Sequence, residues 1–278
     1  MRELERDLPE DASLPAGGVA VPSVAVIGAG RAGRAIAAAA ARSGLPVRLA
    51  RREDALEACR KAELALLCVP DAAIPEACRT VTAAIPPLRF VGHVSGATTL
   101  DVLAPALEHG AEAVSLHPLQ TIPHGAADLT GAPCAISGSS PAASGLAARL
   151  AERLGMRPFT VPEEARVVYH AAASIASNLL VALEESAAGL LARAGIEDGR
   201  ELLAPLVLRS AANWAESGPD ALTGPIARGD EETVRRHLAA LRESAPELIP
   251  VYEALAERAA AVAAEARSEA PDAVETPA

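Results

Sequence analysis

Short apolar runs alternate with Ala-rich stretches through the first half of the chain, and this alternation predicts its fold class. The stretches between the runs are rich in good helix formers, as Arg31–Arg42 illustrates. Strands that alternate with helices in this way predict a doubly wound α/β domain. The runs expected to form its strands are Val24–Ile27, Val47–Ala50, Leu64–Val69, Phe90–Val94, Ala113–Leu116, Cys134–Ile136 and Phe159–Val161.

No strand pattern occurs after Pro162, so an all-helical domain is expected to follow the α/β domain. The helical patterns end at glycine and proline residues and cover Glu163–Ala194, Asp198–Glu216, Glu231–Arg242 and Ala245–Ala264. The first of them carries apolar residues around most of its surface, which predicts burial on more than one side. We therefore expect a homodimer that is joined through the helical domain.

The expected domain bounds are 23–162 for the α/β domain and 163–265 for the helical domain. The flanking segments 1–22 and 266–278 are charged or rich in Ala, Glu and Pro, without a hydrophobic period. Neither segment can bury enough apolar surface to order itself, so both are expected to be disordered tails.

The most informative motif follows the first expected strand directly. Gly28-Ala29-Gly30-Arg31-Ala32-Gly33 has the form G-x-G-x-x-G and lies between a strand and a helix. The first glycine permits a tight turn, the second lets backbone amides approach a pyrophosphate, and the third lets the helix pack on the strand. The helix N-terminus adds partial positive charge. The motif predicts dinucleotide binding, and the alternative is a glycine-rich turn that has lost its nucleotide.

The end of the second expected strand refines the choice of cofactor. An NAD site usually has an Asp or Glu there for the ribose 2′-hydroxyl, whereas this chain has Arg51 and Arg52. Guanidinium groups suit a 2′-phosphate through charge-assisted hydrogen bonds, and Arg31 could stack on the adenine or join them. NADP is therefore the expected cofactor, with simply solvated arginines as the alternative.

Polar side chains follow three successive strands at their carboxyl ends, where α/β sheets bind ligands. These side chains are Asp71, Ser95 and His117. We expect Val69, Pro70, Asp71 and Ser95 to contact the cofactor and His117 to be a proton donor. The alternatives are helix capping for Asp71, a turn role for Ser95 and a structural role for His117.

The helical domain adds a second polar group. His170, Ser174 and Asn178 are spaced four residues apart and form one ridge on an otherwise apolar helix. The ridge either lines the cleft or bonds to a neighbouring helix. In the first case His170 is a second candidate acid, Ser174 binds substrate and Asn178 orients the reacting atom. Arg228 lies in the expected loop Leu222–Asp230, whose last residue should cap the next helix, and it either binds a substrate carboxylate or pairs across a subunit contact.

Composition narrows these possibilities. A net charge of −11 argues against nucleic-acid binding. The four cysteines lack metal-ligand spacing, so we expect no metal site and reduced, mostly buried thiols in a cytoplasmic protein. Neither a signal peptide nor an apolar run able to span a membrane is expected. The single lysine, Lys61, lies away from the expected site, which excludes Schiff-base chemistry. Tyr169 is followed by Ala173 where Tyr-x-x-x-Lys enzymes have their lysine.

Several of these motifs together resemble one family, namely Gly28–Gly33, Val69–Asp71, His93–Ala97, Ser115–Gln120 and Leu222–Asp230. They are similar to those of the Rossmann-like oxidoreductases that carry a C-terminal helical domain of unknown function (2520). That family is similar in architecture to ketopantoate reductases, pyrroline-5-carboxylate reductases and 3-hydroxyacid dehydrogenases. The resemblance spans nearly all of the chain between the expected tails. It implies a Rossmann domain, a nicotinamide cofactor and dimers joined through the helical domain, but no substrate.

In two of these related groups the first long helix carries Lys-x-x-x-Asn, which corresponds here to Ser174 and Asn178. The asparagine is present and the lysine is absent, so the proton would come from His117 or His170. These patterns together predict an NADPH-dependent oxidoreductase that acts on a small polar carbonyl or imine, with a carboxylate on the substrate. The alternative is a non-catalytic NADP-binding sensor or a dimeric scaffold.

Overall fold

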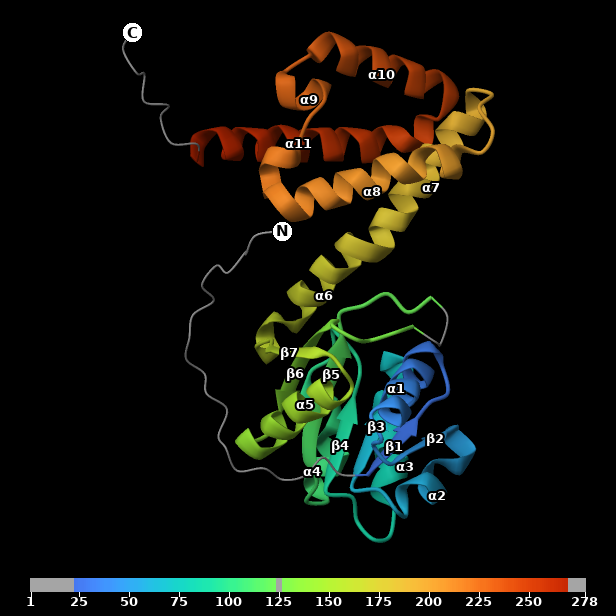
Figure 1. Ribbon diagram of the computed structural model, residues 1–278, viewed down its shortest axis with the longest axis vertical. Helices are drawn as coiled ribbons and strands as arrows, with labels where there is room; N and C mark the ends of the chain where they lie inside the picture. The colour runs from blue at the N-terminus through green and yellow to red at the C-terminus, as the bar shows by residue number, and fades with distance from the viewer. Residues whose placement is uncertain (1–22, 124–126, 270–278) are drawn as a thin grey trace. The chain divides into compact units, whose positions relative to one another are not determined.

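The computed structural model describes residues 23–123 and 127–269 (Figure 1). The chain divides into two compact units, of which the first ends at Ile175 and the second begins at Ala176. The tail expected at 1–22 and the part of the second tail beyond residue 269 lie outside the described residues. Residues 266–269 are helical, so the expected start of the second tail is wrong, because the Ala-rich helix simply continues.

The first unit is built on a seven-stranded sheet with the order β2-β1-β3-β4-β5-β6-β7. Its neighbouring strands are parallel, except that β5 and β6 pair in antiparallel fashion. The doubly wound α/β fold is thereby confirmed. The strands are β1 (Val24–Ile27), β2 (Val47–Ala50), β3 (Leu64–Leu67), β4 (Phe90–His93), β5 (Glu112–Pro118), β6 (Pro133–Gly138) and β7 (Arg157–Thr160).

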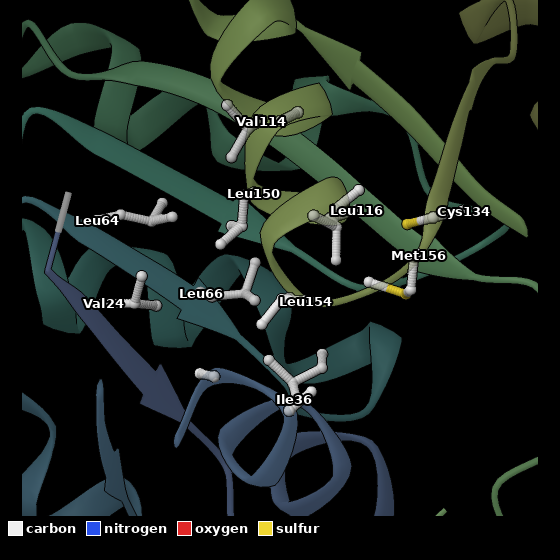
Figure 2. Packing of buried hydrophobic residues seen from close by; sticks show 14 of the residues in the cluster. Val24, Ile36, Leu64, Leu66, Val114, Leu116, Cys134, Leu150, Leu154 and Met156 are labelled. Carbon is white, nitrogen blue, oxygen red and sulfur yellow. The ribbon is translucent and has the colours of Figure 1, made fainter. Parts of the chain in front are cut away.

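Helices cover both faces of this sheet. The helices α1 (Arg31–Arg42) and α5 (Pro141–Arg153) contribute to one buried cluster. Figure 2 shows this cluster, in which Ile36 of α1 and Leu150 of α5 lie among side chains of the central strands. The opposite face is covered by α2 (Ala55–Cys59), α3 (Ile74–Thr82) and α4 (Ala104–Glu108). All four cysteines are free and buried, as the sequence predicted.

The strands β3 to β7 all differ in length from the predicted runs, and the differences at β3 and β5 bear on the site. Strand β3 ends at Leu67 rather than Val69, and β5 extends through His117 to Pro118. The extension is stabilised by β6, because His117 pairs with Ala135 and Pro118 with Cys134 in the antiparallel ladder. Short 3₁₀ turns connect several strands to the following helices, namely η1 (Arg52–Asp54), η2 (Asp71–Ala73), η3 (Leu100–Leu103) and η4 (Glu163–Ala165).

A long helical segment follows η4. It comprises α6 (Arg166–Ser174), a π-helical turn η5 (Ile175–Leu179) and α7 (Leu180–Arg193). The first unit includes α6 and so extends beyond the expected boundary after Pro162. The physical reason is that the side chain of Arg166 is fully buried and bonded to the strand domain.

The second unit contains further helices and no strand among its described residues. They are α8 (Gly199–Ser217), η6 (Gly218–Ala221), α9 (Pro225–Arg228), α10 (Glu231–Ser244), η7 (Pro246–Leu248) and α11 (Ile249–Glu269). The segment expected as a loop contains α9, which begins at Pro225 and ends at Arg228, and the next residue, Gly229, is in the left-handed region. Asp230 caps α10 as predicted, because its side chain accepts a hydrogen bond from the Thr233 amide.

Much apolar surface of the helical region is exposed. The segment Glu163–Arg193 is long and apolar enough to cross a membrane by length and composition, with a mean hydropathy of 1.4 over a window of which 0% is buried. The expectation that no such run exists is therefore wrong, since no charged residue separates Val167 from Leu183. Within residues 176–269, the buried hydrophobic side chains are only Leu241, Ala245 and Ala263.

Candidate functional site

The glycine turn lies between β1 and α1, as the motif predicts. A Cβ atom added to Gly28 would lie 2.3 Å from the carbonyl oxygen of Cys68, and Gly28 has a φ of +115°. A Cβ on Gly33 would lie 1.9 Å from the carbonyl oxygen of Gly28. A Cβ on Gly30 would meet nothing within 4 Å, and Gly30 is exposed. The outer glycines are thus required by close packing, whereas the middle one faces open space.

This turn fits a dinucleotide diphosphate. Gly30 is the N-cap of α1, and no side chain caps the helix there. The first amides of a helix have no acceptor within it and favour an anion. Arg34 stabilises the turn, because its Nε donates a hydrogen bond to the carbonyl oxygen of Ala29 over 2.8 Å. The strand order also reverses between β1 and β3, and ligands of such sheets bind at this switch point.

The arginines expected to recognise a 2′-phosphate lie beside the turn. Arg51 follows β2 and is exposed, as is Arg31 at the start of α1. Arg52 is also exposed but forms an ion pair with Glu76 of α3, which the sequence did not suggest. Arg52 and Glu76 line a cavity of about 50 Å³ together with Ile27, Ala55, Val69, Ala73, Ala77 and Thr80. An anion at Arg52 would therefore compete with the Glu76 carboxylate.

Asp71 and Ser95 meet at the carboxyl ends of β3 and β4. Ser95 is buried, and its Oγ donates a hydrogen bond to Oδ2 of Asp71 over 2.8 Å. Oγ of Ser95 also accepts a hydrogen bond from the Thr98 amide. Neither η2 nor α3 has a side-chain cap, so the capping alternative for Asp71 is wrong. Val69 and Pro70 connect β3 to η2, and Val69 lines the small cavity described above.

The side chain of His117 forms a hydrogen bond with a residue of α6. Its Nδ1 lies 2.7 Å from the hydroxyl oxygen of Tyr169 in α6, and the two rings are nearly perpendicular. Burial lowers the pKa of His117 to about 4, with the charges of His170 and Arg166 acting in the same direction. The imidazole is therefore neutral near pH 7. It can donate a hydrogen bond in that state, but it is not a reservoir of protons at neutral pH.

His117 and His170 meet over Gly96. A Cβ added to Gly96 would lie 2.6 Å from Nδ1 of His170 and 2.8 Å from Nε2 of His117. The ring centroids of the two histidines are 5.8 Å apart. His170 is exposed, whereas His117 is half-buried. The absence of a side chain at residue 96 thus lets two imidazoles approach the same point of the backbone.

His93 also belongs to this group, although the sequence analysis assigned it no role. The residue is fully buried at the end of β4, where its Nδ1 accepts a hydrogen bond from the Ser95 amide over 3.2 Å. Its Nε2 lies 3.3 Å from the carbonyl oxygen of Thr99. Burial, with a contribution from Arg166, lowers the pKa of His93 to about 4. Its position at a strand end was the signal that could have indicated it.

The sequence analysis also missed an ion pair between the fully buried Arg166 and the half-buried Glu163. Nε of Arg166 is 2.8 Å from Oε1 of Glu163, and its Nη2 donates to Oγ of Ser137 over 2.8 Å. Oε2 of Glu163 accepts a hydrogen bond from the Leu100 amide. Burial alone would raise the pKa of Glu163, but the hydrogen bonds from Ser137, Arg166 and Leu100 outweigh it and hold the pKa below its usual range.

The other predicted site residues lie on different elements. Ser174 is half-buried at the end of α6, on the same helix as His170. Asn178 is exposed in the π-helical turn and belongs to the second unit. The expected ridge assumed uninterrupted α-helical spacing, and the π-helical turn changes that spacing after Ser174. Arg228 is exposed at the end of α9, also in the second unit.

Among residues 23–123 and 127–269, no group of three or more His, Cys, Asp or Glu side chains could hold a metal ion. The polar side chains gathered at the carboxyl ends of β3, β4 and β5 are those of the histidines, Tyr169, Ser95 and Asp71. These residues can hold polar groups of a ligand beside the glycine turn, which lies in the same unit.

Family comparisons agree with this architecture. Residues 23–68 match the NAD binding domain of 3-hydroxyacyl-CoA dehydrogenases, and residues 48–118 match a Rossmann-like domain. Residues 132–259 match a domain of unknown function, DUF2520. No curated protein sequence matches the chain.

Solved structures share the fold at low identity. A candidate NADP oxidoreductase of Bacteroides fragilis, BF3122, is 24% identical, with a TM-score of 0.72 over 86% of this chain and 98% of its own. A reductive aminase of Aspergillus terreus, in complex with NADPH and ethyl levulinate, is 18% identical, with a TM-score of 0.63 over 90% and 100%. Pyrroline carboxylate reductase of Plasmodium falciparum, with NADP bound, is 14% identical, with a TM-score of 0.58 over 88% and 100%. The chain is therefore similar to NAD(P)-binding, Rossmann-like domains over residues 23–118 and to the DUF2520 domain over residues 132–259, and it shares the fold of these structures.

Proposed function

We propose that this protein is an NADPH-dependent reductase of a small polar carbonyl or imine that bears a carboxylate. The observation that carries the proposal is the open glycine turn at Gly30, in the same unit as the His117–His170 pair. One part of the unit can hold a dinucleotide, and the other presents hydrogen-bonding groups for a reacting substrate. The reductases among the structural neighbours are consistent with this pairing.

The bound cofactor would supply a hydride to the substrate carbon. In our proposal, neutral His117 donates a hydrogen bond from Nε2 to the substrate oxygen or nitrogen, while Tyr169 occupies Nδ1. His170 supplies the proton, because its exposed ring can exchange protons with water. Ser174, on the same helix as His170, contributes to substrate binding. The roles expected of Asn178 and Arg228 in orienting the reacting group and binding the substrate carboxylate stay predictions from the sequence.

The preference for NADPH is proposed from Arg51 and Arg52. Arg51 is exposed at the end of β2, where the ribose 2′-position is recognised in related folds. Arg52 becomes available once its ion pair with Glu76 opens. A 2′-phosphate can accept bidentate hydrogen bonds from a guanidinium group, which a 2′-hydroxyl cannot do.

The cofactor preference is tested by titrating the full chain with NADPH and with NADH. We expect tighter binding of NADPH, and a loss of about tenfold for NADPH alone in Arg51→Gln, from one charge-assisted contact. Glu76→Gln should tighten NADPH binding, because Arg52 loses its competing carboxylate. Arg153→Gln, at an exposed position in α5, is the matched control. Equal affinities of the wild-type protein for both cofactors would contradict the assignment.

The reaction is tested by following NADPH absorbance with a panel of small keto acids and cyclic imino acids. Asn178→Ala and His170→Asn should lower kcat on any substrate found. A protein that binds NADPH but turns over none of the panel would favour the sensor or scaffold function. That alternative is motivated by Ser174, which stands where two related groups have a lysine.

We also propose that the protein is a homodimer joined through the helical unit. Exposed apolar side chains on α7 and α8 support it, including Val181, Leu206 and Trp214 at 63%, 63% and 68% exposure. Exposed patches of this kind mark protein or membrane contacts. Sedimentation of the full chain without detergent should give a dimer, and Leu206→Asp should shift it towards monomer. A chain that stays monodisperse only in detergent or on vesicles would point to a membrane instead.

A further inference from the structure

Arg166 is a fully buried charged residue whose place the glycine turn and the two histidines do not explain. It is the first residue of α6, and its guanidinium reaches three elements. The group pairs with Glu163 of η4, donates to Ser137 of β6, and lies 3.4 Å through Nη1 from the carbonyl oxygen of Ser95 after β4. A single side chain thus joins the start of the helix to strand β6 and to the loop after β4.

Stability alone does not explain why the charged side chain of Arg166 is buried here. Removing the guanidinium of Arg166 from water costs free energy that its attraction to the half-buried Glu163 carboxylate barely returns, and apolar side chains of similar volume often serve as well. The pair is instead arranged around one loop. Arg166 holds the Ser95 carbonyl at the beginning of this loop, and Glu163 accepts the Leu100 amide at its end. Inside the loop, the Thr98 amide donates to Oγ of Ser95.

We propose that Arg166 is a positioning residue that, together with Glu163, fixes the loop from Ser95 to Leu100 beneath the rings of His117 and His170. The carbonyl that Arg166 holds belongs to the peptide bond between Ser95 and Gly96. Gly96 is the residue over which both imidazoles approach the backbone, with space for no side chain. A movement of this peptide would therefore move the surface on which the two rings rest. The proposal rests on the proposed function only in that the two histidines serve the reaction.

The charge of Arg166 acts on the same histidines. The ionisable groups that face His117 are His170, Arg166, Asp71, His93 and Tyr169, whose hydroxyl contacts Nδ1. Of these, Asp71 favours the charged imidazolium, whereas Arg166 disfavours it and helps burial to keep the pKa of His117 low. Loss of the guanidinium should therefore raise the pKa of His117, and this shift is separate from any change in the loop.

The test is NMR of the full chain without cofactor or substrate, which reads the pKa of His117 and hydrogen exchange at the loop amides. Arg166→Met should raise the pKa of His117 by about 1 unit and speed exchange at Thr98 and Leu100 about tenfold. Arg166→Lys should speed exchange in the same way but leave the pKa nearly unchanged, because it retains the charge. Arg79→Met, at an exposed position in α3, is the matched control and should change neither.

The double variant Arg166→Met/Glu163→Gln keeps the test decisive if the single variant fails to fold, because it leaves no unpaired buried charge. It should show the same faster exchange at Thr98. Unchanged loop exchange and an unchanged pKa of His117 in a folded variant would overturn the positioning role. Because neither readout involves a cofactor or substrate, this outcome is distinguishable from failure of the reductase proposal.

Discussion

The hydroxyl oxygen of Tyr169 lies 2.7 Å from Nδ1 of His117, so a residue of α6 holds the imidazole at the end of β5. This contact leaves Nε2 of His117 pointing towards the space above Gly96, where His170 also arrives. A histidine whose orientation is fixed by a neighbour can present one defined nitrogen to a ligand. The pair with Tyr169 therefore decides which face of His117 is available.

Removal of the Tyr169 hydroxyl should loosen this histidine. We expect Tyr169→Phe to destabilise the fold by about 1 kcal/mol, as one lost hydrogen bond does, and to give a mixture of His117 tautomers. Nitrogen chemical shifts of the imidazole would report that mixture. The matched control is Tyr252→Phe, because Tyr252 makes a 2.8 Å contact to Nδ1 of His237 in the second unit. A single unchanged tautomer in Tyr169→Phe would show that the Tyr169 hydroxyl does not determine the tautomer of the His117 imidazole.

A methyl group at residue 96 should displace the histidines without straining the backbone. The φ of Gly96 is not in the left-handed region, so Gly96→Ala acts only through the contacts of its Cβ with His117 and His170. We expect shifted imidazole resonances, a loss of turnover and little change in NADPH affinity. Gly189→Ala in α7 is the control, because its Cβ meets nothing within 4 Å. Turnover retained in Gly96→Ala would remove both histidines from the mechanism.

The glycine turn should separate cofactor binding from stability. Gly30→Ala adds a methyl group in open space, so the melting temperature should hold while affinity for either nicotinamide dinucleotide falls at least about tenfold. Gly33→Ala should instead lower the melting temperature, because its Cβ would overlap the carbonyl of Gly28. Calorimetric titration and thermal unfolding measure the two effects. Unaltered affinity in Gly30→Ala would contradict diphosphate binding at this turn.

Stability should fall in mild acid because of His93. Its pKa is about 4 in the folded protein, against a value of 6.5 when it is exposed. Between these values the unfolded chain binds the proton and the folded one does not. The stability is therefore fully present above about pH 6.5 and is lost as the pH falls towards about 4. The loss is about 3 kcal/mol for a buried group with this shift.

Urea unfolding measured at several pH values tests this dependence. His93→Gln should flatten the slope, because glutamine does not titrate, although it will be less stable throughout. His109→Gln, which changes an exposed histidine of the same unit, should retain the wild-type slope. A slope that survives in His93→Gln would assign the pH dependence to other groups, of which His117 is the first to examine.

The sequence predicted the first β–α–β segment well because its signals are local. The apolar run of β1, the three glycines and the Ala-rich helix each depend on neighbours within a few residues. By contrast, the sequence offered helix capping as a role for Asp71, whereas its side chain accepts a hydrogen bond from Ser95, a residue 24 positions away. The π-helical turn after Ser174 likewise carries no composition that distinguishes it from an α-helix.

By itself the sequence determined the doubly wound domain, the helical region after it and the seat for a dinucleotide, because periodicity and glycine spacing are properties of consecutive residues. Only the tertiary structure decided which side chains surround His117. Tyr169, His170 and Arg166 come from one helix, whereas Gly96 lies in the loop after β4 and Ser137 in β6, and no spacing along the chain relates that helix to these two residues. Burial then lowered the pKa of His117 and His93, since the loss of water around an imidazole appears only when the elements pack.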